Sequence, residues 1–158
     1  MKLHIRQRIF SWTDSYDIYT EDNTPRYAVK SRFFALSHRL HVYDKHSGRE
    51  IGSISQRLFS LLPTFDIEIN GQSVGSIRRK FTLLRQSYEV DYLGWDVDGD
   101  FVGWDYRVMQ GGTEIMSITK EIWNWSDTYT LCFRNPADEI PGLLLVLAID
   151  AANCSHND

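Results

Sequence analysis

Three aspartates at alternate positions, Asp96, Asp98 and Asp100, are the first residues whose type and spacing could do chemistry. Hard cations such as Ca²⁺ bind several carboxylate oxygens at once, so a calcium loop is one interpretation. An EF-hand that began at Asp96 would need Gly at position 6 and Glu at position 12, whereas Gly99 is at position 4 and Arg107 is at position 12. The Asp98-Gly99 pair is also typical of a type I′ hairpin turn. We therefore predict a hairpin turn here and no metal site.

A short basic run, Arg78-Arg79-Lys80, with Arg85 close behind it, is the only dense group of cations in the sequence. Guanidinium and ammonium groups bind phosphate oxygens, so these four residues are candidates for an anion-binding site. On a strand, Arg78 and Lys80 would share one face, while Arg79 would point to the other. The alternative interpretation is a solvated sheet exterior, whose charges prevent pairing between sheet edges.

The five histidines do not form a catalytic or metal-ligating pattern. His38 and His41 are three residues apart, which on a strand places them on opposite faces. The sequence also contains no nucleophile elbow, phosphate-binding loop or dinucleotide-binding fingerprint. We therefore predict a protein that is not an enzyme and that needs no cofactor. The histidines are His4, His38, His41, His46 and His156.

The overall charge argues against nucleic acid as a partner. The chain has 17 Lys and Arg against 21 Asp and Glu, a formal net charge of −4, whereas binding to a phosphate backbone starts from a basic surface. The first half of the chain is net basic and the second half is net acidic, which predicts one basic and one acidic surface. No apolar signal segment follows Met1, and Cys132 and Cys154 belong to no CxxC pair, so we expect a cytoplasmic location, at most peripheral to a membrane.

Most of the chain alternates apolar and polar residues with a period of two, which is typical of strands with one buried face. Turn residues such as Asn70-Gly71 separate these segments at short spacing. A chain of 158 residues predicts one domain over residues 1–158, and the pattern predicts an all-β, closed antiparallel barrel. The clearest alternation is found in Tyr16–Thr20, Arg26–Lys30, Leu40–Tyr43 and Phe65–Ile69.

The C-terminal segment 140–152 departs from this alternation, because it is apolar all round until Asp150. Asp138 and Glu139 suit the N-terminal end of a helix, Pro141 suits its first turn, and Asn153 suits its end. At 1.5 Å per residue such a helix is roughly 20 Å long, short of the ~30 Å hydrocarbon core of a bilayer. We therefore predict a helix enclosed by the barrel, with no transmembrane insertion.

Two segments resemble the LURP-one-related family, whose bacterial members are called YxjI-like. Trp95–Tyr106 is similar to that family's W-x-V-x-G-D-F stretch, and Ile118–Tyr129 is similar to its I-x-[KR]-x-W-x-x-W-x-D-x-Y segment. The resemblance covers roughly residues 16–152. It implies the tubby C-terminal-like fold, a barrel of about twelve strands around a hydrophobic C-terminal helix, which phospholipid scramblases and tubby proteins share.

The resemblance also implies which partners to expect. Tubby-type barrels bind phosphoinositide head groups, so an anionic phospholipid surface is the first expected partner, and the candidate residues for it are Arg78, Arg79, Lys80 and Arg85. A protein-interaction scaffold, in bacterial stress or envelope physiology, is the alternative. A calcium-linked, scramblase-like function has less support, because Asp127 matches one aspartate of the scramblase segment while Trp125 replaces the other. Trp123 and Trp125, two residues apart, would lie on one face of a strand.

Overall fold

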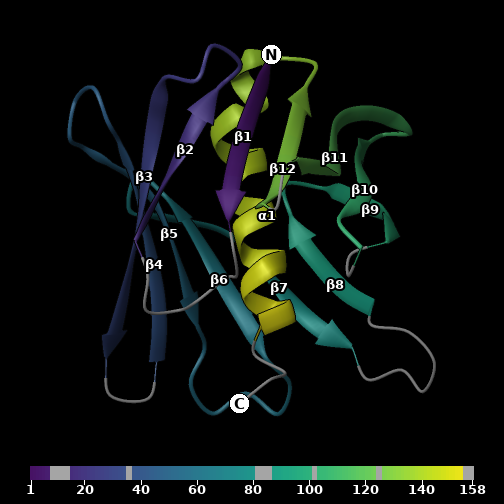
Figure 1. Ribbon diagram of the computed structural model, residues 1–158. Coiled ribbons are helices and arrows are strands. Elements are labelled where there is room, and N and C mark those ends of the chain that lie inside the picture. Colours follow the sequence, from purple (N-terminus) through teal and green to yellow (C-terminus); the bar gives the residue numbers. More distant parts are fainter. Residues whose placement is uncertain (8–14, 35–36, 81–86, 101–102, 124–125, 155–158) are drawn as a thin grey trace.

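The computed structural model of the chain describes residues 1–7, 15–34, 37–80, 87–100, 103–123 and 126–154. Within them, strands surround one long C-terminal helix (Figure 1). The strands are β1 (Lys2–Gln7), β2 (Tyr16–Thr20), β3 (Pro25–Phe34), β4 (Ser37–Asp44), β5 (Glu50–Gln56), β6 (Thr64–Ile69), β7 (Gln72–Lys80), β8 (Ser87–Tyr92), β9 (Trp95–Asp100), β10 (Asp105–Gln110), β11 (Thr113–Trp123) and β12 (Ser126–Phe133). A short 3₁₀ helix, η1 (Pro136–Asp138), leads into α1 (Glu139–Cys154).

The strands form one 12-stranded antiparallel sheet in the order β8-β7-β6-β5-β4-β3-β2-β1-β12-β11-β10-β9. Strands that are consecutive in the chain pair with each other, except for β8 and β9, and β1 also pairs with β12, which joins the two ends of the meander. The two edge strands, β8 and β9, follow one another through a turn at Leu93-Gly94. The result is a nearly closed barrel with α1 in its interior, which confirms the predicted fold class.

The period-two pattern corresponds to alternate burial along the strands. In β6, Phe65 and Ile67 point to the interior and are fully buried, whereas the alternating residues Asp66 and Glu68 point outward. Asn70 and Gly71 join β6 to β7 with φ values of 50° and 78°, as the predicted type I′ turn requires.

The hairpin turn predicted at Asp98-Gly99 is wrong, because both residues lie inside β9. Gly99 has a φ of 128°, and a Cβ atom at this position would come within 2.6 Å of the carbonyl oxygen of Asp105 and 2.7 Å of the Cα of Tyr106. Glycine is therefore needed for the close approach of β9 to β10 rather than for a turn.

The interior helix is buried along its length, as the all-apolar segment predicts. Residues 143–149 are each at most 1% exposed and pack against the inward side chains of the barrel. The helix continues through Cys154, so Asn153 does not end it; instead the Oδ1 atom of Asn153 accepts a hydrogen bond from the Tyr88 hydroxyl of β8. In the part of the chain that the structure describes, no helix combines the length and the apolar character needed to cross a bilayer.

Candidate functional site

The basic run forms the last residues of β7, at the end of the barrel where α1 also finishes (Figure 1). Ile77 points to the core and is fully buried, so the strand alternation turns Arg78 and Lys80 outward, where both are exposed. Arg79 lies on the inner face at the rim of the barrel and is half-buried. The predicted division of the run between two faces is thus seen in the structure, whereas Arg85 lies outside the described residues.

The strand register adds three further cations to the outer face at this end. Arg32 pairs with Arg39 across β3 and β4, and Arg39 pairs with Ser55 of β5. Arg57 follows β5 and donates its backbone N–H to Thr64, which is the register partner of Arg78 on β7. We call this set of exposed cations the basic belt: Arg32, Arg39, Arg57, Arg78 and Lys80.

Two carboxylates neutralise part of the basic belt. The Arg78 Nη2 atom donates to Glu89 Oε2 at 2.6 Å, and this contact lowers the pKa of Glu89 below its ordinary value. Arg57 binds Asp66 through two hydrogen bonds, of 3.1 Å from Nε and 2.5 Å from Nη2, which raise the pKa of Arg57. The belt's five cations against these two carboxylates leave a surplus of three positive charges. Among the described residues, the belt's other three cations form no ion pair.

Sequence reasoning found the cations of β7 and missed those of the neighbouring strands. Arg32, Arg39 and Arg57 are isolated in the sequence and join the others only through the register of β3 to β7. The signal that could have located them is each residue's place at the same end of its strand. To recognise that shared position, one must know both where each strand begins and ends and which strands pair.

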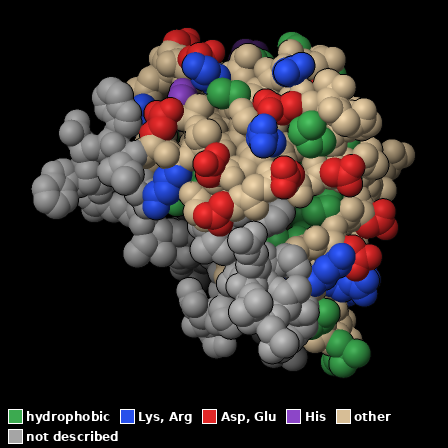
Figure 2. All heavy atoms as spheres, turned by 90° about the vertical axis from the view of Figure 1, so that its right-hand side faces the viewer, with side chains coloured by type: hydrophobic (Ala, Val, Ile, Leu, Met, Phe, Trp, Pro, Cys, Tyr) green, Lys and Arg blue, Asp and Glu red, His purple; other side chains and the backbone are tan. Residues whose placement is uncertain are grey.

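The acidic side chains gather on a different part of the barrel, over β8 to β10. Asp96, Asp98 and Asp100 are all exposed at alternate positions of β9, about 7 Å apart along the strand, so they do not converge on one cation. Arg107 of β10 lies opposite Asp98 in the register. Acidic side chains are spread over the face seen in Figure 2, which carries these strands. Within the described residues, no three His, Cys, Asp or Glu side chains form a metal-binding group, and the side chain of Asp127 is outside them.

The histidines take separate structural positions. His41 lies on the outer face of β4, where its Nδ1 atom is 2.9 Å from Glu50 Oε1, whereas His38 lies at an inward position of the same strand. His4 Nδ1 is 3.1 Å from the Thr130 hydroxyl oxygen. His46 is exposed in the turn after β4, and His156 lies outside the described residues.

A cleft of about 560 Å³ lies at the other end of the barrel, between the β2–β3 and β4–β5 turns. Its cations are already engaged: Lys45 Nζ lies 3.1 Å from Asp17, and Arg26 Nε lies 3.3 Å from Glu139. The Thr20 hydroxyl donates to Asp22 and lowers the pKa of that carboxyl. Both cations of the cleft are therefore paired with carboxylates, whereas among the described residues only two of the five cations of the basic belt are. Its lining residues are Thr20, Asp22, Thr24, Pro25, Arg26, Lys45 and His46.

The described tryptophan side chains pack into the core. Trp95 and Trp104 are 4% and 8% exposed. The Trp104 ring lies 4.0 Å from the ring of Tyr129, and Trp95 meets Tyr92 edge-on at 5.5 Å. Core packing is the ordinary role of such rings, so these two residues do not mark a binding surface. The side chains of Trp123 and Trp125 lie outside the described residues.

Comparison with known proteins places the barrel in a family. The profile of the family described as LURP-one-related matches residues 1–150. The chain belongs to the LURP-one-related family. It is 31% identical over 158 residues to a Bacillus subtilis (strain 168) protein named "Uncharacterized protein YxjI", an alignment that covers 100% of this chain and 97% of the relative.

The LURP-one-related fold is also seen in a solved structure. An Arabidopsis thaliana protein determined by X-ray crystallography superposes with a TM-score of 0.63 at 12% identity, covering 95% of this chain and 91% of the other. At that identity the likeness shows the fold alone. Neither the family description nor the name of the Bacillus relative includes an enzymatic activity.

Proposed function

We propose that this LURP-one-related protein is a non-enzymatic module that binds the surface of anionic phospholipid membranes through the end of the barrel carrying the basic belt. The observation that supports the proposal most is the clustering of Arg32, Arg39, Arg57, Arg78 and Lys80 on one outer surface of a chain with a net charge of −4. Such clustering separates the two signs of charge, so that the molecule can approach a negative surface with its positive end first.

The geometry fits a surface better than a single phosphate-binding pocket. The cations extend over β3, β4, the residue after β5, and β7 instead of converging, so that each can meet a different lipid head group. Each cation near an anionic membrane contributes about 1 kcal/mol. The three-charge surplus therefore supports reversible, peripheral binding rather than permanent attachment.

Vesicle flotation tests the proposal. Wild-type protein is mixed with phosphatidylcholine vesicles that contain 0, about 15 or about 30% phosphatidylserine at roughly physiological salt, where the screening length is about 8 Å. We expect the bound fraction to rise with phosphatidylserine and to fall severalfold when the salt concentration is raised fivefold. Removing two cations at about 1 kcal/mol each corresponds to about a 30-fold loss of affinity, and reversal adds repulsion. Arg78→Glu/Lys80→Glu should therefore bind at least 30-fold more weakly.

The matched control is Arg107→Glu/Lys120→Glu, which makes the same change in net charge on exposed residues of β10 and β11. We expect it to lose only the small affinity that follows from total charge. If the wild type ignores phosphatidylserine, or if both double variants lose binding equally, the proposed function is wrong. If no variant binds vesicles but all of them still co-purify with the same protein, the result would instead favour the protein-interaction scaffold.

A further inference from the structure

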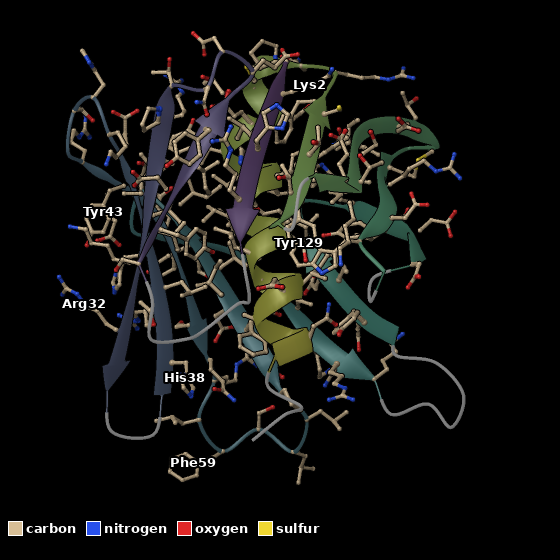
Figure 3. All side chains as sticks on the ribbon, in the orientation of Figure 1. Lys2, Arg32, His38, Tyr43, Phe59 and Tyr129 are labelled. Carbon is tan, nitrogen blue, oxygen red and sulfur yellow. The ribbon has the colours of Figure 1, made fainter. Side chains whose placement is uncertain are left out.

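The loop between β5 and β6, residues 57–63, exposes large apolar side chains at the same end of the barrel as the basic belt. Phe59 is 98% exposed and Leu61 is fully exposed, while Leu58 is 46% exposed. These are three of the five large hydrophobic side chains that the structure shows as exposed among the described residues, the others being Met1 and Leu93. Figure 3 shows Phe59 pointing away from the lower end of the barrel. The three side chains thus form one apolar projection.

The backbone of this loop is held in place by hydrogen bonds at its base. The N–H of Arg79 donates to the carbonyl oxygen of Pro63 at 3.0 Å, and the N–H of Arg57 donates to that of Thr64 at 2.8 Å. The Thr64 hydroxyl donates to the Leu62 carbonyl at 3.0 Å and lies 2.9 Å from the Ser60 hydroxyl. The loop is therefore anchored to the end of β7, and the projection has a defined position beside the basic belt.

The fold itself does not account for the residue type at position 59. Phe59 has a φ of 60°, a left-handed conformation that is costly for a bulky side chain and cheap for Gly or Asn. Because the Phe59 side chain is 98% exposed, no burial in the core offsets this strain. A bulky apolar residue in a strained, exposed position is explained by a contact outside the molecule.

The chemistry around the projection selects a lipid bilayer as that contact. Arg57 is the first residue of the loop, and Arg79 and Lys80 end the strand to which the loop's base is hydrogen-bonded, so cations flank the base of the apolar tip. Figure 2 shows hydrophobic side chains projecting at this end next to Lys and Arg side chains. An apolar tip with cations at its base suits the membrane interface, where the tip reaches the acyl boundary and the cations meet phosphates. A protein partner would need a cavity that matches the projecting tip, whereas a bilayer needs none.

We propose that Leu58, Phe59 and Leu61 insert into the membrane interface and give the bound state a component that salt does not screen. This inference rests on the proposed function, because insertion follows the electrostatic approach of the basic belt. Insertion also fixes the orientation of the barrel, with the end of α1 toward the membrane and the β2–β3 and β4–β5 turns away from it.

The test uses two variants of the full chain and phosphatidylcholine vesicles with about 30% phosphatidylserine. Phe59→Ser/Leu61→Ser removes the apolar tip, and we expect a loss of affinity of tenfold or more, with the remaining binding abolished by high salt. Leu93→Ser is the matched control, because Leu93 is also exposed, at 42%, in a left-handed turn with a φ of 53°. Leu93→Ser should bind like the wild type. An unchanged melting temperature of the double variant shows that the fold is intact.

A second measurement detects insertion directly. Phe59→Trp places an indole at the tip, and vesicles with brominated acyl chains should quench its emission beyond the level measured for the wild type. Insertion is wrong if Phe59→Ser/Leu61→Ser binds like the wild type and the indole of Phe59→Trp is not quenched. If Arg78→Glu/Lys80→Glu loses binding in the same experiment, the proposed function stands. If the wild type binds no vesicle, both are wrong.

Discussion

Gly52 of β5 lies directly against Leu144 of the interior helix, so closely that a Cβ atom on Gly52 would come within 2.5 Å of the Leu144 Cδ1 atom. The same Cβ would lie 2.8 Å from the carbonyl oxygen of Glu68. Leu144 itself is fully buried. The missing side chain of Gly52 therefore sets how near the barrel wall approaches the helix.

We expect Gly52→Ala to destabilise the protein by about 1–3 kcal/mol, because the methyl group overpacks this contact. Leu144→Ala should cost about 2–5 kcal/mol through the cavity that it leaves. The double variant should be less destabilised than the sum, because the shortened side chain on the helix leaves room for the new methyl group on β5. Urea unfolding of the three variants measures this coupling. Costs that add within about 0.5 kcal/mol would contradict the packing relationship.

Glu139, the first residue of α1, ties the helix to β3. The residue is only 5% exposed. Its carboxylate accepts a hydrogen bond from the Tyr27 hydroxyl and another, at 3.3 Å, from Arg26 Nε. Burial and the hydrogen bond to Glu139 raise the pKa of Tyr27. Glu139→Ala leaves the buried hydroxyl without its acceptor, so we expect a loss of about 1–3 kcal/mol, or roughly 2–12 °C in melting temperature.

Tyr27→Phe serves as the comparison for Glu139→Ala, because it removes one donor and leaves Glu139 bound to Arg26. Its cost should be smaller. Differential scanning fluorimetry distinguishes the two, and equal melting temperatures for Glu139→Ala and the wild type would show that this buried contact contributes nothing to stability.

Asp150 is an acidic side chain inside the barrel, 3% exposed. Burial raises the pKa of its carboxyl well above the ordinary value, and Tyr106 of β10 lies near enough to interact with it electrostatically. The folded protein therefore keeps a proton that the unfolded chain releases above about pH 4. The folded state binds more protons than the unfolded state in this range, so this group makes stability fall as pH rises from about 4 through the raised pKa.

Asp150→Asn removes that titration and keeps the shape of the side chain. We expect the variant and the wild type to differ least near pH 4–5, and the variant to gain stability relative to the wild type, by up to about 1.4 kcal/mol per pH unit, until the pH reaches the raised pKa of Asp150. Urea unfolding at pH 5, 6, 7 and 8 provides the measurement. Parallel stability curves for the two proteins would mean that Asp150 ionises in the folded state as it does in water.

Added calcium should leave the melting temperature unchanged, because Asp96, Asp98 and Asp100 are spread along one strand. With free Ca²⁺ at 100 times the dissociation constant, a single site would stabilise the folded protein by about 2.7 kcal/mol, which raises the melting temperature of a domain of this size by several degrees. Scans with Ca²⁺ and with a chelator are compared, with Mg²⁺ as the control. A rise of several degrees that Mg²⁺ does not produce would identify a calcium site.

The amino-acid sequence by itself determined the elements of this protein. Alternation located strands such as β2 and β6, because a strand with one buried face must alternate wherever it is placed. The apolar segment at 143–149 predicted an enclosed helix, since a helix without a polar face needs protein on every side. The motifs around Trp95 and Ile118 then pointed to the family, and through it to the number of strands.

Only the tertiary structure decided which residues come together. Asp98-Gly99 has the composition of a turn, yet its glycine is required by the approach of Tyr106 from β10, a contact that local sequence does not contain. Arg32 and Arg57 join the basic run because of strand register, a relationship between segments far apart in the chain. The exposure of Phe59 could not be predicted from the sequence either, because whether an apolar loop residue is buried depends on which other parts of the chain pack against it.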